Sequence, residues 1–269
     1  GSHAVGRVLG RPSSVRGGPP LAWTVSSLLY WVSALLCLPS GAGVPTVSST
    51  TQHSGIAGSF RYLSARPLAL EAICAVAIHC SLTMAYQGML PMFVSLDLAA
   101  PSSIYGALLA SIGLGAVLGS LALARFDGER YRPTLFVVSL IGSGASLTVM
   151  AATQSSLVAV ISGFFVGSTQ AMFMSMTLAL IQSSVDDHFR GRATSAYQVI
   201  TLTPMAVLGW GMGGLADIAQ PRPVMVVSGI AFLAVMLVYA VFSPSIRRLL
   251  GRQGWQEGAG RLEPSTLSS

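Results

Sequence analysis

Seven long apolar stretches fill most of the chain, and their length is the feature that most limits its fold. A helix of about 20 residues crosses a bilayer core about 30 Å thick, since each residue rises about 1.5 Å. A spanning strand would need only about ten residues of alternating polarity, which these stretches lack. Lipid offers no hydrogen-bond partners, so each stretch must satisfy its own backbone, and we expect helices. The stretches cover residues 21–39, 68–94, 104–124, 133–152, 156–182, 194–215 and 224–242.

The composition also excludes an ordinary soluble domain. Hydrophobic residues make up 52% of the chain and charged residues only 9%, whereas soluble domains carry about 25% charged residues. The net charge of +6 comes from arginine alone, because the sequence contains no lysine. These arginines flank the apolar stretches and form no basic stripe with aromatic residues. We therefore expect a lipid bilayer as a partner and no nucleic acid.

The arginines fall mainly in alternate gaps between the apolar stretches, which predicts how the chain is threaded. Cytoplasmic connections of membrane proteins carry the excess of arginine. The alternate gaps and the tail contain Arg61, Arg66, Arg125, Arg130, Arg132, Arg190, Arg192, Arg247, Arg248, Arg252 and Arg261, whereas the other gaps contain Arg222 alone. We predict a multi-pass protein of the cell membrane, with these connections and the C-terminus in the cytoplasm.

The N-terminal segment does not fit this scheme. With seven spans the N-terminus would lie outside the cell, yet Arg7, Arg11 and Arg16 precede the first span. Either the sequence is truncated here or the first span does not insert as drawn, and we favour a truncated sequence.

The pattern predicts an all-α polytopic bundle in five parts. Residues 1–20 match no recognisable unit, and 21–43 form one transmembrane helix. Residues 44–66 are a cytoplasmic linker, in a region rich in Ser, Thr, Gly and Pro. A six-helix bundle spans 67–243, and a polar cytoplasmic tail covers 244–269.

Enzyme chemistry and metal binding find no support in the sequence. Cys37, Cys74 and Cys80 lie inside apolar stretches and show no paired or metal-binding spacing. The acidic and histidine residues at 186–188 are adjacent, so they do not converge like ligands spaced along a helix face. No phosphate-cradling loop or nucleophile elbow is present. We expect no catalytic residue, no metal and no cofactor.

Several short motifs occur in the order used by the major facilitator superfamily. In the drug and siderophore exporter branch, which includes the enterobactin exporter, similar motifs mark helices 7 to 12 of the fold. The motifs are Gly58–Leu63, Arg66–Pro67, Leu90–Phe93, Tyr105–Ala110, Gly113–Gly119, Arg125–Arg130, Phe189–Ala193, Gly209–Asp217 and Pro221–Pro223. The chain therefore resembles the C-terminal half of such a transporter, helices 6–12.

The resemblance implies efflux of a drug-like, siderophore or other amphipathic small molecule by alternating access, driven by a proton gradient. Transporters of this kind bind their solute between two halves. The resemblance thus also implies a further partner, which is the missing N-terminal half or a second chain. The alternative is a membrane interaction protein that does not transport, or an inactive half-transporter fragment.

Polar side chains within the spans are the candidates for a solute cavity, because such groups in lipid are costly and turn inward. The polar candidates are Tyr86, Gln87, Gln170, Tyr197 and Gln198. Met174 is added to them because methionine provides an adaptable apolar surface. Hydrogen bonding between helices is the alternative role. His79 lies near the middle of a span and is a possible proton relay, since an unperturbed histidine has a pKa of about 6.5. A neutral, hydrogen-bonded histidine is the alternative.

Charges in the arginine-rich connections suggest a cytoplasmic gate made of ion pairs. The resemblance assigns this role to Arg125, Asp127, Arg130, Asp187, Arg190 and Arg192. Exposed ion pairs contribute about 0 to 1 kcal/mol each, which is weak enough to break in every transport cycle. The alternative is a solvated loop whose arginines only set the topology.

Small residues four apart predict close helix contacts. The pairs are Gly115 and Gly119, Gly163 and Gly167, and Gly209 and Gly213. Sliding surfaces for alternating access and static close packing are both compatible with this spacing.

Overall fold

The computed structural model describes Leu28 and residues 67–126, 131–185 and 190–242. The chain divides into two compact units, residues 1–52 and 53–269, and every helix described below belongs to the second unit. The predicted first span, apart from Leu28, lies outside the described residues, as do the linker and the tail. So do the predicted gate residues Asp127, Arg130 and Asp187.

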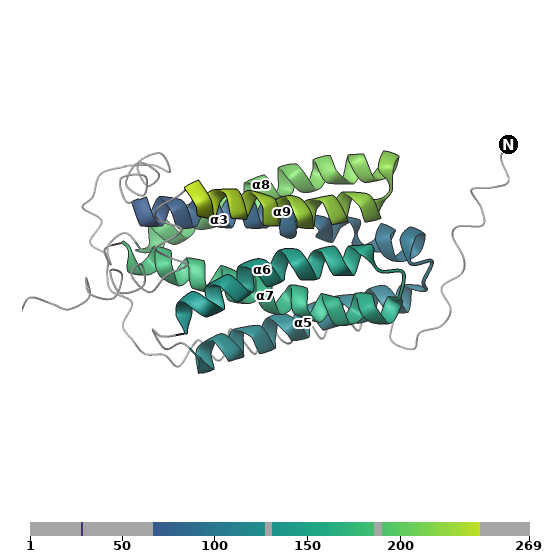
Figure 1. Ribbon diagram of the computed structural model, residues 1–269, viewed down its shortest axis with the longest axis horizontal. Coiled ribbons are helices and arrows are strands. Elements are labelled where there is room, and N and C mark those ends of the chain that lie inside the picture. Colours follow the sequence, from purple (N-terminus) through teal and green to yellow (C-terminus); the bar gives the residue numbers. More distant parts are fainter. Residues whose placement is uncertain (1–27, 29–66, 127–130, 186–189, 243–269) are drawn as a thin grey trace, which may run out of the picture. The chain divides into compact units, whose positions relative to one another are not determined.

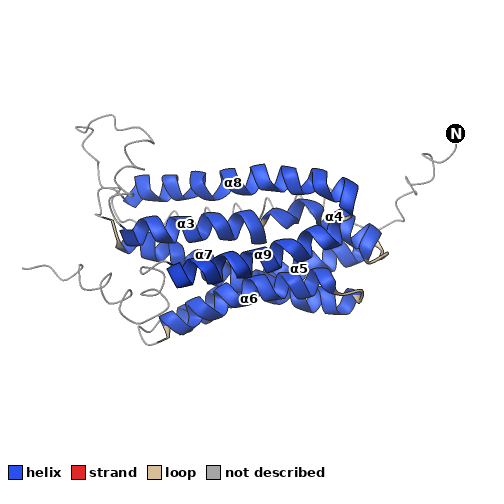
Figure 2. Cartoon of the chain, turned by 45° about the horizontal axis from the view of Figure 1, so that its top comes forward, coloured by secondary structure: helices blue, strands red, loops and turns tan. Residues whose placement is uncertain are grey.

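The second unit is an all-helical bundle with six segments long and apolar enough to cross a membrane (Figures 1 and 2). The described residues contain no strand. Five segments are single helices that end within a few residues of the predicted limits. They are α5 (Ser102–Arg125), α6 (Arg132–Ala152), α7 (Ser156–Ser183), α8 (Arg190–Ala219) and α9 (Pro221–Phe242).

The first of the six spans, Ala69–Asp97, is broken rather than continuous. Helix α3 (Pro67–Thr83) is followed by a 3₁₀ turn, η2 (Ala85–Met89), the short α4 (Leu90–Met92) and a π-helical turn, η3 (Phe93–Asp97). Gly88 and Pro91 explain the break. Glycine weakens a helix, and proline lacks an N–H and clashes with the carbonyl four residues earlier.

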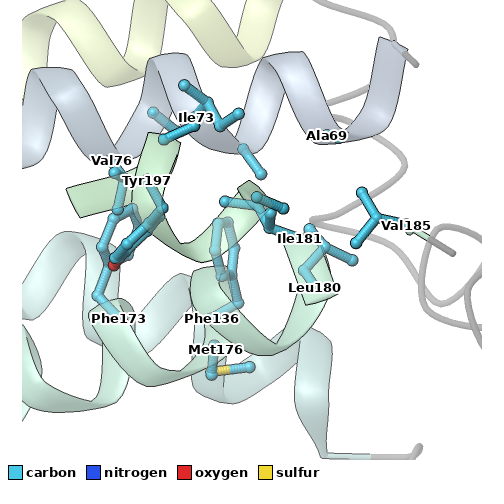
Figure 3. Packing of buried hydrophobic residues seen from close by; sticks show 14 of the residues in the cluster. Ala69, Ile73, Val76, Phe136, Phe173, Met176, Leu180, Ile181, Val185 and Tyr197 are labelled. Atoms are coloured by element: carbon cyan, nitrogen blue, oxygen red, sulfur yellow. The ribbon is translucent and has the colours of Figure 1, made fainter. Parts of the chain in front are cut away.

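Helix α7 occupies the middle of the bundle. It packs extensively against α5 and α6, while α6 also packs against α9, and α3 packs against α8 and α9. Figure 3 shows part of the hydrophobic core, which includes Phe136 of α6, Phe173 of α7 and Tyr197 of α8. The rings of Phe136 and Phe173 stack at a centroid distance of 5.3 Å. In the apolar 18-residue stretch of each span, 61% is buried for the span containing α3 and 50% for α7, but only 17% for α5 and 11% for α8. Helices α5 and α8 therefore leave most of their surface without a partner in the described part of the chain.

Four glycines bring α5 and α7 into close contact. A Cβ added to Gly167 would lie 2.7 Å from the Ile112 carbonyl carbon, and one added to Gly115 would lie 2.8 Å from the Phe164 carbonyl carbon. Gly119 and Gly163 are similarly crowded. Because most of these neighbours are backbone atoms, the two helices approach as closely as they do only while these positions lack side chains.

The third predicted glycine pair behaves differently. A Cβ on Gly209 would meet the Ala85 carbonyl oxygen at 3.5 Å, which is an ordinary contact. No described atom lies within 4 Å of the corresponding point at Gly213. The structure thus brings Gly209 next to η2, whereas a side chain added at Gly213 would meet no neighbouring helix among the described residues.

Candidate functional site

Four of the six residues predicted to line a cavity lie inside the bundle, near the end of α3. Tyr86, Gln170 and Tyr197 are buried, and Met174 is partly buried. The Tyr197 hydroxyl lies 3.4 Å from the Met174 carbonyl oxygen, to which it donates, and 3.5 Å from the Met174 sulfur. In this conformation the four side chains connect α3 and η2 with α7 and α8.

Gln170 has a specific partner at the break in α3. Its amide nitrogen donates a hydrogen bond to the Thr83 carbonyl oxygen, and the Thr83 hydroxyl donates to the His79 carbonyl at 2.7 Å. A helix end leaves carbonyl groups unsatisfied, and lipid offers no donor for them. Gln170 therefore compensates for the interruption of the helix. The Tyr86 hydroxyl lies close to the same amide without a hydrogen bond of standard geometry.

The other two predicted cavity residues, Gln87 and Gln198, are exposed. Gln87 belongs to η2, which packs against α8 near Gly209. Gln198 lies eleven residues before Gly209 in α8, which is about 16 Å along the helix axis at about 1.5 Å per residue. The structure therefore places these two amides on the exposed surface at different depths and does not gather them into one pocket.

His79 is buried in a pocket with one polar and two aromatic neighbours. Its Nε2 atom is 2.8 Å from the Ser143 hydroxyl of α6, within hydrogen-bond distance. The imidazole stacks on Phe173 at a centroid distance of 4.4 Å and meets the edge of Phe232 at 5.3 Å. Its Nδ1 atom has no hydrogen-bond partner among the described residues. This environment links α3 to α6, α7 and α9.

The predicted gate is only partly described. Arg125 is exposed in the last turn of α5, where its charge suits the negative end of the helix dipole. Arg190 and Arg192 lie in the first turn of α8. The ion-pair gate remains a prediction, since its acidic members lie outside the described residues.

An ion pair that sequence reasoning missed joins Asp97 of η3 to Arg222 at the start of α9. The Arg222 Nε atom lies 3.7 Å from Asp97 Oδ1, and the Arg222 backbone N–H donates to Oδ2 at 3.0 Å. The guanidinium also donates to the Asp97 carbonyl oxygen at 2.8 Å. The Asp97 side chain is only 7% exposed and the Arg222 side chain 24%.

A signal for this pair was present in the sequence. Asp97 is the only charged residue in its gap and Arg222 the only arginine in its gap, and the threading places both gaps on the same side of the membrane. Opposite charges on one side of the membrane are natural partners. Arg222 is also the one arginine between two spans that departs from the alternate-gap pattern, and its pairing with Asp97 compensates its charge.

Among the described residues, no group of three or more His, Cys, Asp and Glu side chains could hold a metal ion.

Comparison with known protein families gives one match. The sequence model of the Major Facilitator Superfamily matches residues 72–264, which include almost all of α3 and every later helix. Comparisons with curated proteins and with solved structures give no match. The matched stretch covers well over half of the chain, and the all-helical bundle agrees with it. The chain belongs to the Major Facilitator Superfamily.

Proposed function

We propose that this chain forms one side of a solute path and exports an amphipathic small molecule by alternating access, driven by a proton gradient. Membership of the superfamily supports membrane transport in general. The observation that carries the finer proposal is the exposure of Gln87 and Gln198 within membrane-spanning segments.

An amide exposed inside a bilayer is unfavourable when it faces lipid, because its hydrogen-bonding groups are left without partners. Gln87 and Gln198 are therefore expected to face water, solute or another protein surface. Gln87 lies on η2, which contacts α8 at Gly209, and Gln198 lies eleven residues before Gly209, about 16 Å along the helix axis. The two amides therefore suit a path that crosses the membrane better than a single closed pocket. Their neutral amides, set among apolar side chains, suit a solute with both polar and apolar parts.

The other side of this path requires a second helical bundle. Helices α8 and α5 are the least buried spans, so their surfaces are open to such a partner. In transporters built from repeats the solute binds where the repeats meet. We propose that another half of the same transporter, or a second chain, covers these helices.

The sequence suggested His79 as a possible proton relay. His79 lies in a pocket formed by Ser143, Phe173 and Phe232, and these contacts support a structural role that connects four helices. We therefore assign the coupling group to the other half of the transporter. The assignment of the chain to the drug and siderophore exporter branch rests on the resemblance of its sequence motifs.

Removing either exposed amide is expected to reduce transport without unfolding the bundle. Gln87→Ala and Gln198→Ala should each lower dye efflux about fivefold, since one lost hydrogen bond to a solute costs about 1 kcal/mol. The measurement is efflux of amphipathic fluorescent dyes from membrane vesicles that contain the full-length protein, with the pH gradient present or collapsed.

Gln220→Ala is the matched control, because Gln220 is also exposed but lies between α8 and α9, outside the spans. Its efflux should equal that of the unmodified protein. Equal efflux in all three variants would refute the path. If no dye moves although the protein is inserted normally, the alternative of a membrane protein without transport activity is favoured.

A further inference from the structure

Three sulfur atoms meet inside the bundle beside the break in α3. The Cys80 Sγ atom lies 3.7 Å from the Met84 Sδ atom and 3.5 Å from the Met174 Sδ atom. Cys80 is buried, whereas Met84 and Met174 are partly exposed. The cluster thus has a buried thiol at its centre and two thioethers at its more accessible edge.

The local structure explains why these side chains converge. Cys80 and Met84 are four residues apart, and the Met84 backbone N–H donates to the Cys80 carbonyl oxygen at 3.3 Å, which completes the last helical turn. Residues at this spacing lie on one face of a helix. Met174 comes from α7, and the Tyr197 hydroxyl lies 3.5 Å from its sulfur. Helix α3 and the turn after it therefore supply two of the sulfur atoms, α7 supplies the third, and Tyr197 of α8 contacts the sulfur of Met174.

We propose that Cys80, Met84 and Met174 bind one soft monovalent cation, Cu(I), in a three-coordinate sulfur site. Thiolate and thioether sulfur are the ligands that select Cu(I) in proteins. Metal–sulfur bonds of about 2.3 Å place the sulfur atoms of a trigonal site about 4 Å apart. The two distances from the Cys80 sulfur, 3.5 Å to Met174 and 3.7 Å to Met84, need an expansion of only a few tenths of an ångström. The two methionine sulfurs would close the third side of the site when the ion binds.

The charge balance favours a monovalent ion. When Cu(I) binds, the Cys80 S–H bond breaks, an S–Cu bond forms, and the proton leaves to solvent without any change in oxidation state. One positive charge replaces another, so the net charge of the buried site does not change. A divalent ion would leave an uncompensated positive charge in the membrane interior, which is costly.

The neighbouring groups do not compete for this role. The Nε2 atom of His79 is within hydrogen-bond distance of the Ser143 hydroxyl. Cys74 lies elsewhere on α3, where its thiol interacts with Tyr239 of α9. Met176, also on α7, packs into the hydrophobic core. Cys74 and Met176 therefore offer control positions with the same chemistry outside the cluster.

The test is a competition for Cu(I) between the full-length protein in detergent and the coloured chelator bicinchoninate under reducing conditions. The unmodified protein should withdraw one Cu(I) per chain from the chelator. Cys80→Ser, Met84→Leu and Met174→Leu should each weaken the affinity at least tenfold. The two leucine variants preserve side-chain size, so they test the sulfur ligands with little change in packing.

Cys74→Ser and Met176→Leu should bind Cu(I) as the unmodified protein does. X-ray absorption of the loaded protein should show a coordination shell of sulfur alone. Equal affinity in all five variants, failure of the unmodified protein to compete with the chelator, or a shell containing nitrogen or oxygen would each overturn the proposal. None of these outcomes depends on dye efflux, so this test is independent of the proposed export function.

Discussion

Gly167→Ala is expected to destabilise the bundle by about 3 kcal/mol, the upper part of the usual range for overpacking. An added Cβ would lie 2.7 Å from the Ile112 carbonyl carbon and closer still to its oxygen. These are backbone atoms, so no side-chain rotation can relieve the overlap, and α5 would have to move away from α7. Gly115→Ala should act in the same way, because its Cβ would overlap the Phe164 carbonyl.

The measurement is denaturant unfolding of the purified protein in detergent micelles, followed by circular dichroism. Gly113→Ala is the matched control, since Gly113 lies on α5 with no described atom within 4 Å of the added Cβ. It should be neutral or slightly stabilising, because alanine is a better helix former by about 1 kcal/mol. Equal stability of Gly167→Ala and Gly113→Ala would show that the two helices are not in backbone contact.

Asp97→Ala is expected to cost about 2 kcal/mol. The substitution leaves the Arg222 guanidinium partly buried without its counter-charge and removes the acceptor of the Arg222 backbone N–H. Breaking a fully buried pair costs about 3–5 kcal/mol. The exposure of Arg222 reduces this figure through solvent screening.

A double-mutant cycle measures the interaction itself. Asp97→Ala, Arg222→Ala and the double variant are compared by the same unfolding measurement, and the double variant should be less destabilised than the two single effects added together. Asp217→Ala is the control, because Asp217 is an exposed carboxylate of α8 near the start of α9. Strict additivity of the Asp97 and Arg222 effects would contradict a stabilising contact between η3 and α9.

The spanning segments could be predicted because membrane thickness dictates their length. The limits of α5, α6 and α7 agree with the apolar stretches to within about two residues. The break after Thr83 was missed, although Gly88 and Pro91 mark it. Most of the surrounding residues are apolar and none is charged, so the apolar stretch continues across the break.

The site was harder to predict because these helices are apolar on every side. Without an amphipathic stripe, the sequence does not indicate which face of a helix turns inward. Gln170 and Gln198 therefore looked equivalent, yet the first is buried against Thr83 and the second is exposed. The cluster of Cys80, Met84 and Met174 could not be predicted either. Met174 is far from Cys80 and Met84 in the sequence, and nothing in the apolar pattern indicates that α7 packs against the end of α3.

Threading through the membrane underlies every functional conclusion, and cysteine accessibility tests it most directly. Tyr131→Cys and Gln154→Cys are introduced separately into a chain whose own cysteines are replaced by serine. Tyr131 precedes α6 in the arginine-rich connection, whereas Gln154 lies between α6 and α7 in a gap without charge, and both side chains are exposed. The label is a maleimide that does not cross the membrane.

In intact cells the maleimide should label the cysteine at position 154 and leave the cysteine at position 131 unlabelled until the membrane is permeabilised. This result would place the arginine-rich connection in the cytoplasm, on the opposite side of the membrane from the α6–α7 turn. Rapid labelling of position 131 from outside intact cells, with position 154 protected, would contradict the predicted topology.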